Sequence, residues 1–261
     1  MNYNDIIYEK QDNVARIILN RPQVMNAVRP QTVEEILSAL EHTEKDREIG
    51  VLVLTGAGGK AFCSGGDIRW LKDSSSDSSQ DQARISLKIA YTMRNMGKPI
   101  IAAVDGYAVG FGYELLMFCD LVIATKGSKM GVTEVKVGSS PMFGATQWTI
   151  RMIGERRARE LVFMARLIDA QEAYRIGLIN KAVPKGKLPE ELDIWCKKLL
   201  GMSPQSLKLA KTSMNFESDL LYSSITHGVR LWTFLHGSDE WKEGMNAFIE
   251  KREPDFSRFR R

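Results

Sequence analysis

Cysteine is scarce in this chain, and no metal-binding motif accompanies it. The 261 residues include three cysteines, Cys63, Cys119 and Cys196, and none belongs to a C-x-x-C pair. An odd number of widely spaced cysteines argues against the disulfide framework of a small secreted protein. Cys63 lies beside a glycine turn, but no histidine is near it in the sequence, so we interpret it as structural rather than nucleophilic. The sequence therefore predicts neither disulfides nor a metal site.

The chain also lacks a strong charge and a long unbroken apolar run. Its net charge is +4, and basic residues gather only in the terminal FSRFRR, which is too little for a nucleic-acid-binding surface. The most apolar region, 99–124, is interrupted by Asp105, Glu114 and Asp120, so it does not predict a membrane span. The first residues resemble neither a signal peptide nor a transit peptide. We therefore expect a cytoplasmic protein without nucleic-acid or membrane partners.

What is present is the pattern of an α/β protein. The composition, 44% hydrophobic and 26% charged, is ordinary for a globular chain, and the length allows one large domain with a smaller appendage. Two β-branched runs around a polar KQDN predict a hairpin in 6–22. Apolar residues at helical spacing predict a helix over 32–46. Buried strands are expected in 50–56, 98–106 and 120–132. Strands alternating with helices favour parallel βαβ units.

The second half of the chain has a different character. After about Thr146 the pattern is helical, apart from one brief strand near INKAVP. We therefore expect an α/β core over 1–195 and a C-terminal helical region over 196–261. The segment 72–83 is polar and free of aromatic residues, which predicts a mobile stretch.

Two predicted strands end in glycine-rich turns that lead into helices. The first lies in 51–71, VLVLTGAGGKAFCSGGDIRWL, and the second in 100–118, IIAAVDGYAVGFGYELLMF. Glycine permits close backbone approach, and a helix start offers free N–H groups. Two such turns facing one cleft would form an oxyanion hole, although glycines used only for packing give the same pattern. Neither turn has the spacing of a phosphate- or dinucleotide-binding loop, which excludes nucleotide hydrolysis and nicotinamide chemistry.

Two glutamates are candidates for acid–base chemistry. Glu114 follows the second turn and precedes an apolar run, and Glu134 lies in the next loop, MGVTEVKVGSSPMFGAT. A carboxylate pair in an apolar pocket has at least one raised pKa, so one group can donate a proton while the other accepts one. The alternatives are that Glu114 helps to cap its helix and that Glu134 pairs with Lys136 in solvent.

These stretches resemble the crotonase (enoyl-CoA hydratase/isomerase) superfamily over nearly the whole chain. The similarity is carried by ILNRPQVMNAV, LTGAGGKAFCSGGDI, PIIAAVDGYAVGFGYELLMFCDLVIAT, MGVTEVKVG, DAQEAYRIGLINKAVP and EGMNAFIEKREPDF. The resemblance implies a spiral of ββα/βαβ units followed by a C-terminal helical region used in trimer assembly. It also implies an acyl-CoA thioester substrate, no metal or redox cofactor, and a homotrimer or a dimer of trimers.

The resemblance further implies roles for individual residues. Glu114 would activate the water that adds to the β-carbon of a 2-enoyl-CoA, and Glu134 would exchange the proton at the α-carbon. The backbone N–H groups of Gly66 and Phe111 would polarise the thioester carbonyl. The CoA and acyl site would include Val24, Met25, Asn26, Ala61, Ser64, Gly65, Asp67, Ile68, Met142 and Phe143.

The chain departs from the common hydratase pattern at its acyl site. Phe111 stands where common hydratases have glycine, and Met142 and Phe143 replace small residues, so a short, branched or cyclic acyl group becomes plausible. Other stretches resemble the branch that makes or cleaves carbon–carbon bonds in cyclic acyl-CoA substrates, but the aspartate of that branch is missing from SSPMFG, 139–144. The expected activity is hydration of a 2-enoyl-CoA or a cyclic dienoyl-CoA. The alternatives are an isomerase, a ring-cleaving or ring-closing enzyme, and a non-catalytic CoA- or RNA-binding protein.

Overall fold

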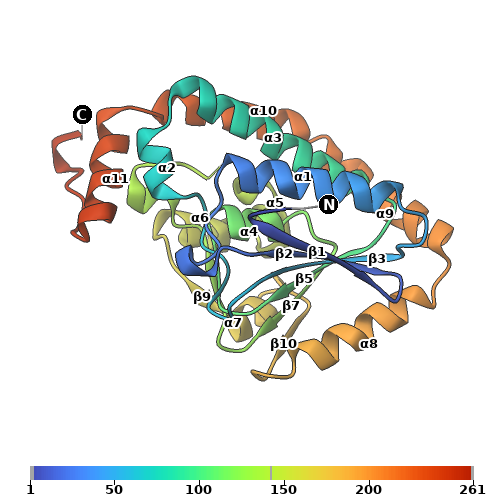
Figure 1. The fold of residues 1–261 in the computed structure, drawn as a ribbon. Coiled ribbons are helices and arrows are strands. Elements are labelled where there is room, and N and C mark those ends of the chain that lie inside the picture. Colours follow the sequence, from blue (N-terminus) through green and yellow to red (C-terminus); the bar gives the residue numbers. More distant parts are fainter. Residues whose placement is uncertain (1–2, 142, 260–261) are drawn as a thin grey trace.

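Two β-sheets form the centre of the fold, and helices cover them (Figure 1). The computed structural model describes residues 3–141 and 143–259. The larger sheet has the order β1-β2-β3-β5-β7-β10, with strands β1 (Ile6–Gln11), β2 (Val14–Leu19), β3 (Val51–Gly56), β5 (Ile100–Val104), β7 (Leu121–Thr125) and β10 (Lys181–Val183). The smaller sheet has the order β4-β6-β8-β9, with strands β4 (Ala61–Cys63), β6 (Tyr107–Val109), β8 (Lys129–Gly131) and β9 (Ile168–Asp169).

The strands alternate between the two sheets, which makes the chain a spiral. β3, β5 and β7 enter the larger sheet in parallel, and each is followed at once by a short strand of the smaller sheet, β4, β6 and β8. Helical segments follow these strand pairs: α2 (Ile68–Asp73), α3 (Ser76–Asn95), α4 (Phe111–Leu116) and the 3-10 helix η2 (Glu134–Val137). The predicted α/β spiral is confirmed. The carboxyl ends of successive strands meet at the same side, where the glycine turns lie.

The remaining helices cover the sheets and form the C-terminal region. They are η1 (Pro22–Val24), α1 (Pro30–Lys45), α5 (Ala145–Ile153), α6 (Glu155–Phe163), α7 (Ala170–Arg175), α8 (Leu188–Leu200), α9 (Pro204–Asp219), α10 (Tyr222–Leu235), α11 (Asp239–Glu250) and η3 (Ser257–Phe259). In Figure 1, α1, α3 and α10 lie side by side over one face of the larger sheet, and α8 lies near its opposite side. The predicted C-terminal helical region is present.

Most of the sequence-predicted elements are confirmed, and two differences have a physical cause. β1 and β2 form the expected antiparallel hairpin, which turns at Asp12 and Asn13 with positive φ. The segment 72–83, predicted to be mobile, is largely helical, because α3 begins at Ser76, where the Ser75 side chain caps the helix by accepting from the N–H of Ser78. The strand β9 was not predicted, since two residues are too few to show an alternating pattern.

Two glycines allow α11 to pack directly on η2, the segment that begins with Glu134. A Cβ atom added to Gly244 would lie 2.2 Å from the carbonyl carbon of Val137, and one added to Gly138 would lie 2.4 Å from the carbonyl oxygen of Glu240. Any side chain at these positions would force the helix away. The last long helix of the chain thereby fixes the loop that carries the second candidate carboxylate.

The substitution Gly244→Ala is expected to destabilise the protein by about 1–3 kcal/mol, because its Cβ overlaps rigid backbone. Chemical denaturation followed by circular dichroism measures the change. Gly127→Ala is the matched control, since nothing lies within 4 Å of a Cβ added there, and its stability should stay near that of the wild type. Equal stability of the two variants would contradict the close packing of α11 on η2.

Candidate active site

The two glycine turns touch each other through their backbones. A Cβ atom added to Gly65 would lie 3.3 Å from the carbonyl oxygen of Val109 and 3.7 Å from the amide nitrogen of Phe111. Gly65 and Gly110 both have positive φ, 98° and 56°, a conformation that glycine adopts without steric cost. The turns are therefore brought together by the absence of side chains at their point of contact.

Each turn presents a backbone amide next to this contact. Val28 donates to the carbonyl of Gly65 and accepts from the N–H of Asp67, both at 2.8 Å, so this bridge bypasses the amide of Gly66. Phe111 is the first residue of α4, where backbone N–H groups have no acceptor within the helix. The amides of Gly66 and Phe111 thus lie on two adjoining turns at the edge of one cavity.

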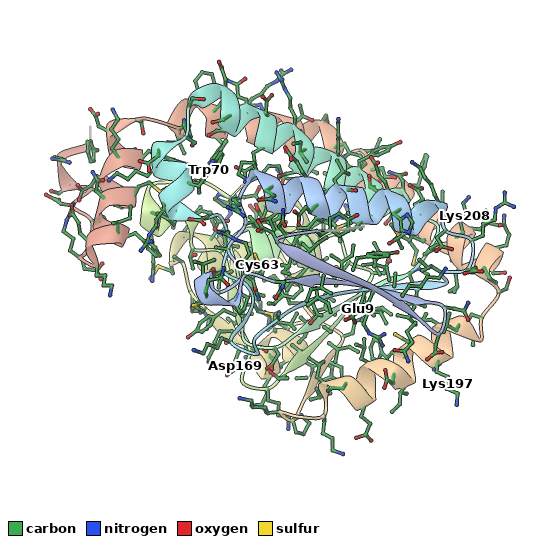
Figure 2. All side chains as sticks on the ribbon, viewed as in Figure 1. Glu9, Cys63, Trp70, Asp169, Lys197 and Lys208 are labelled. Carbon is green, nitrogen blue, oxygen red and sulfur yellow. The ribbon has the colours of Figure 1, made fainter. Side chains whose placement is uncertain are left out.

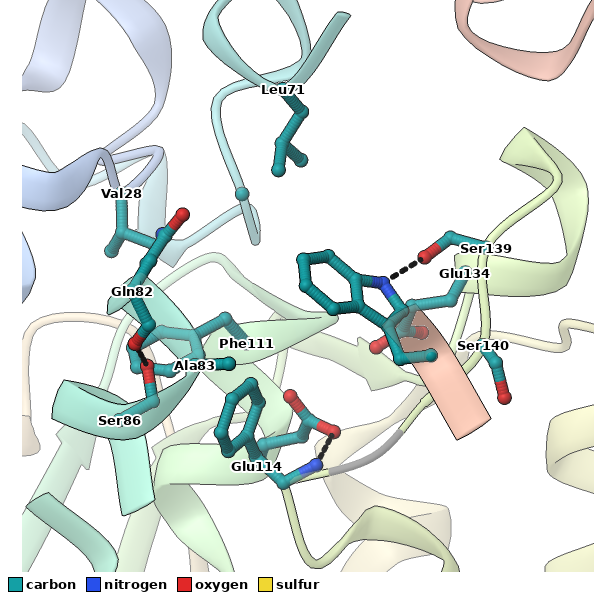
Figure 3. Close-up of a pocket in the computed structure, with 13 residues that line it drawn as sticks. Val28, Leu71, Gln82, Ala83, Ser86, Phe111, Glu114, Glu134, Ser139 and Ser140 are labelled. Atoms are coloured by element: carbon teal, nitrogen blue, oxygen red, sulfur yellow. Dashed lines mark hydrogen bonds between the residues drawn. The ribbon is translucent and has the colours of Figure 1, made fainter. Parts of the chain in front are cut away.

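Glu114 lies one turn into α4 and is almost fully buried, with 3% of its surface exposed. Its Oε1 accepts a hydrogen bond of 2.7 Å from the backbone N–H of Phe143 (Figure 3). This bond joins α4 to the loop that precedes α5 and fixes the direction of the carboxylate. The acceptor is therefore directed toward that loop and not toward the first-turn amides of its own helix.

Glu134 begins η2 and has a contrasting environment. The residue is half-buried, but its Oε2 is buried and has no hydrogen-bond partner within the part of the chain that the structure describes. Burial raises the pKa of Glu134 from 4.5 to about 7. A Cβ added to Gly110 would lie 3.6 Å from Oε1 of Glu134, which places the carboxylate beside the contact between the turns. Among the described residues, no ion pair joins Glu134 to the exposed Lys136.

One cavity of about 90 Å³ unites these groups (Figure 3). Gly66, Phe111, Glu114, Glu134 and Phe143 all line it. The Phe111 and Phe143 rings meet edge to face, with centroids 5.9 Å apart, and both aromatic side chains form part of the cavity wall. Met142 lies outside the described residues.

The other predicted site residues lie next to the first glycine turn but do not line the cavity. Asn26 is buried, and its side-chain amide donates to the carbonyls of Ala57 and Ala61 at 3.0 and 2.7 Å, which ties η1 to β4. Ser64 donates its N–H to the carbonyl of Met25. The structure thus gathers the predicted CoA residues along one connected stretch next to the cavity, but does not place them in its wall: Val24, Met25, Asn26, Ala61, Ser64, Gly65, Asp67 and Ile68.

Several residues of the cavity wall were not found from the sequence. They come from α2, α3, α10, the loop between η1 and α1 and the loop between η2 and α5: Val28, Leu71, Gln82, Ala83, Ser86, Ser139, Ser140 and Trp232. Trp232 donates its indole N–H to Oγ of Ser139 at 3.1 Å, so the C-terminal helix α10 reaches the loop after Glu134. The three-residue spacing of Ala83 and Ser86 indicates a shared helix face, but only the fold shows what that face covers.

The thiol beside the first turn is not part of this chemistry. Cys63 lies in the interior (Figure 2) and is fully buried. Burial raises the pKa of its thiol to about 12, so it stays protonated at neutral pH. The described residues contain no cluster of three or more His, Cys, Asp or Glu side chains suited to a metal ion. Nor does any helix in this part of the chain have the length and apolar character needed to cross a membrane.

Comparison with known proteins assigns the chain to a family. A sequence model of the enoyl-CoA hydratase/isomerase family matches residues 9–259. An enoyl-CoA hydratase from Mycobacterium avium subsp. paratuberculosis K-10 superposes with a TM-score of 0.90 at 23% identity, covering 98% of this chain and 99% of that one. A subunit I enoyl-CoA hydratase structure from Geobacillus kaustophilus HTA426 has a TM-score of 0.78 at 33% identity, covering 97% and 98%.

The spiral of strands and the C-terminal helices define a crotonase-fold protein. The chain belongs to the enoyl-CoA hydratase/isomerase family, which its sequence matches over almost its full length.

The raised pKa of Glu134 gives a testable pH dependence. In the folded protein this carboxyl keeps its proton up to about pH 7, whereas in the unfolded chain it loses the proton near 4.5. The folded state therefore binds the extra proton in this window, and its contribution to stability is lost as the pH rises from about 4.5 to 7. Glu134→Gln should remove that part of the pH dependence of unfolding. NMR of ¹³C-labelled glutamate carboxyls should show the Glu134 signal titrating near 7 in the wild type, and that signal should be absent from the variant. A Glu134 signal titrating near 4.5 would contradict this account.

Proposed function

We propose that this protein is an enoyl-CoA hydratase, which adds water across the conjugated double bond of a 2-enoyl-CoA or cyclic dienoyl-CoA thioester. The observation that carries the proposal is the meeting of two carboxylates and two turn amides at one small cavity. A conjugated thioester needs three things there: a polarised carbonyl, an acid for its α-carbon and a base for the attacking water.

In this mechanism the thioester oxygen accepts hydrogen bonds from the amides of Gly66 and Phe111. As water attacks, electrons move from the double bond toward that oxygen and an enolate-like state forms. Amides held by packed turns need no rearrangement to stabilise this charge, and one such donor is typically worth about 3–4 kcal/mol of barrier. The contact between Gly65 and the second turn supports this role, because it fixes the two donors relative to each other.

The two glutamates divide the proton transfers. Glu114, oriented by the Phe143 amide, removes a proton from the water whose oxygen bonds to the β-carbon. Glu134, whose pKa burial raises to about 7, gives its proton to the α-carbon. The product is the substrate plus one water. Glu114 then releases its proton to solvent and Glu134 takes one up from solvent, which restores both groups to their starting states. The different surroundings of the two carboxylates support these separate roles.

Two further segments support the proposal, the stretch next to the cavity that we assign to CoA and the loop 139–144. The stretch around Asn26 and Ser64 binds the CoA portion, which is part of the substrate, and no separate cofactor is required. The loop 139–144 brings Ser139, Ser140 and Phe143 to the cavity but contains no acid. That absence supports hydration over ring cleavage or ring closure, which in the related branch depends on an aspartate in this loop.

We also propose that the chain assembles as a homotrimer or a dimer of trimers. Large apolar side chains are strongly exposed on the C-terminal helices α9 and α10 and at the end of α9: Met214, Phe216, Leu220 and Phe234, each with more than 70% of its surface accessible. A monomer rarely exposes so many. Burial against further copies would remove this surface from water.

Hydration is tested with crotonyl-CoA and cyclohexa-1,5-diene-1-carbonyl-CoA by following the loss of enoyl-thioester absorbance. The wild type should hydrate at least one of them, and Glu114→Gln and Glu134→Gln should each lower kcat by about 10²–10⁴-fold, as expected for the loss of a general acid or base. Mass spectrometry distinguishes the product, which gains one water in hydration and keeps its mass in isomerisation. A product of unchanged mass, or full activity in both variants, would contradict the hydratase mechanism. Unchanged circular dichroism and acyl-CoA binding are the controls for folding.

Light scattering during size-exclusion chromatography tests the assembly. One chain has a mass of 29.4 kDa, so three give about 88 kDa and six about 176 kDa. Phe234→Asp should shift the protein toward smaller species, because it places a charge on an apolar contact. Asp239→Asn, on the exposed surface of α11, is the comparison variant. A wild-type protein of about 29 kDa would contradict the proposed assembly.

A further inference from the structure

One wall of the cavity carries polar groups that the proposed reaction does not use. Gln82 and Ser86 lie four residues apart on α3, so they share one face of that helix. Both line the cavity together with the glutamates. Figure 3 shows them on the opposite side of the cavity from Glu134 and Ser139. They are therefore separate from the groups that we assign to proton transfer.

The two side chains offer hydrogen-bond acceptors. Oε1 of Gln82 is buried and has no hydrogen-bond partner within the described residues. The Ser86 hydroxyl is buried and donates to the backbone carbonyl of Gln82 at 2.9 Å, so its proton is committed and its oxygen remains an acceptor. A buried polar atom without a partner is costly, and such atoms in a native protein call for an explanation.

The rest of this wall is apolar. Val28, Leu71, Ala83 and Phe111 surround the two polar groups. A purely hydrocarbon acyl group would bury Gln82 Oε1 without satisfying it. A hydroxyl group would donate to Oε1 and accept from the amide nitrogen of the same side chain, so it satisfies Gln82 with a single group. A charged group would be unsuited to the apolar surroundings.

We infer that the acyl portion of the ligand carries a hydroxyl group, in addition to the thioester carbonyl, and that this hydroxyl donates a hydrogen bond to Oε1 of Gln82. This inference rests on the proposed acyl-CoA function and specifies its substrate class. The hydroxyl is not the one that hydration installs at the β-carbon, since that position lies at the glutamates. Gln82 is thus a specificity-determining residue.

Binding of saturated thioesters tests the inference without requiring catalysis. Isothermal titration calorimetry compares butanoyl-CoA with 4-hydroxybutanoyl-CoA and hexanoyl-CoA with 6-hydroxyhexanoyl-CoA, which place the hydroxyl at two distances from the thioester. In at least one pair the wild type should bind the hydroxylated thioester about tenfold more tightly, the effect of one well-formed hydrogen bond. Equal or weaker binding of the hydroxylated member in both pairs would overturn the inference and indicate that water alone occupies this wall.

Three variants locate the effect. Gln82→Met, of similar length but without polar groups, should abolish the preference. Ser86→Ala should leave it largely unchanged, because the Ser86 proton is bonded to the backbone carbonyl of Gln82. Lys88→Met, on the exposed face of the same helix, should retain it. A preference that survives in Gln82→Met would overturn the assignment of this residue.

The outcomes also separate this inference from the proposed function. Tight binding of the hydroxylated thioester without hydration of any enoyl-CoA would leave the hydroxyl preference standing and contradict the hydratase. Hydration with no hydroxyl preference would do the reverse. If no thioester binds, both proposals fail together.

Discussion

The site depends on one backbone contact, between Gly65 of the first turn and the Val109–Phe111 segment of the second. Any side chain at Gly65 would press on that segment, so the turns can meet only because the residue has none. Their contact sets the amides of Gly66 and Phe111 relative to each other and brings the Glu134 carboxylate beside Gly110. The parallel strands beneath supply the rigid support, because each turn follows a short strand of the smaller sheet.

Burial then gives two chemically identical side chains different properties. Glu114 receives an amide hydrogen bond from Phe143, whereas Glu134 has a buried oxygen without a partner and a raised pKa. A protonated acid and an oriented acceptor can thus coexist in one small cavity near neutral pH. The C-terminal helices help to position Glu134. Gly244 allows α11 to pack closely on η2, and Trp232 of α10 donates a hydrogen bond to Ser139 in the loop after η2.

Local sequence patterns predicted the elements near the site, whereas the other residues of the cavity wall are brought there by long-range packing. The hairpin, α1 and the main strands follow from alternation and helical spacing. The two glycine turns could also be located in the sequence, but their contact with each other depends on the fold. The same reasoning did not reveal the start of α3 within 72–83, where a serine caps the helix in a polar stretch. It could not find Gln82 or Trp232, since nothing in the sequence tells which face of α3 or α10 meets the cavity.

The central claim is that water and a proton add across the double bond under the control of this carboxylate pair, and hydration in D₂O tests it most directly. NMR of the product should show one deuterium at the α-carbon, on a single face, and a hydroxyl at the β-carbon. A migrated double bond without a new hydroxyl, or deuterium distributed over both faces of the α-carbon, would contradict the account.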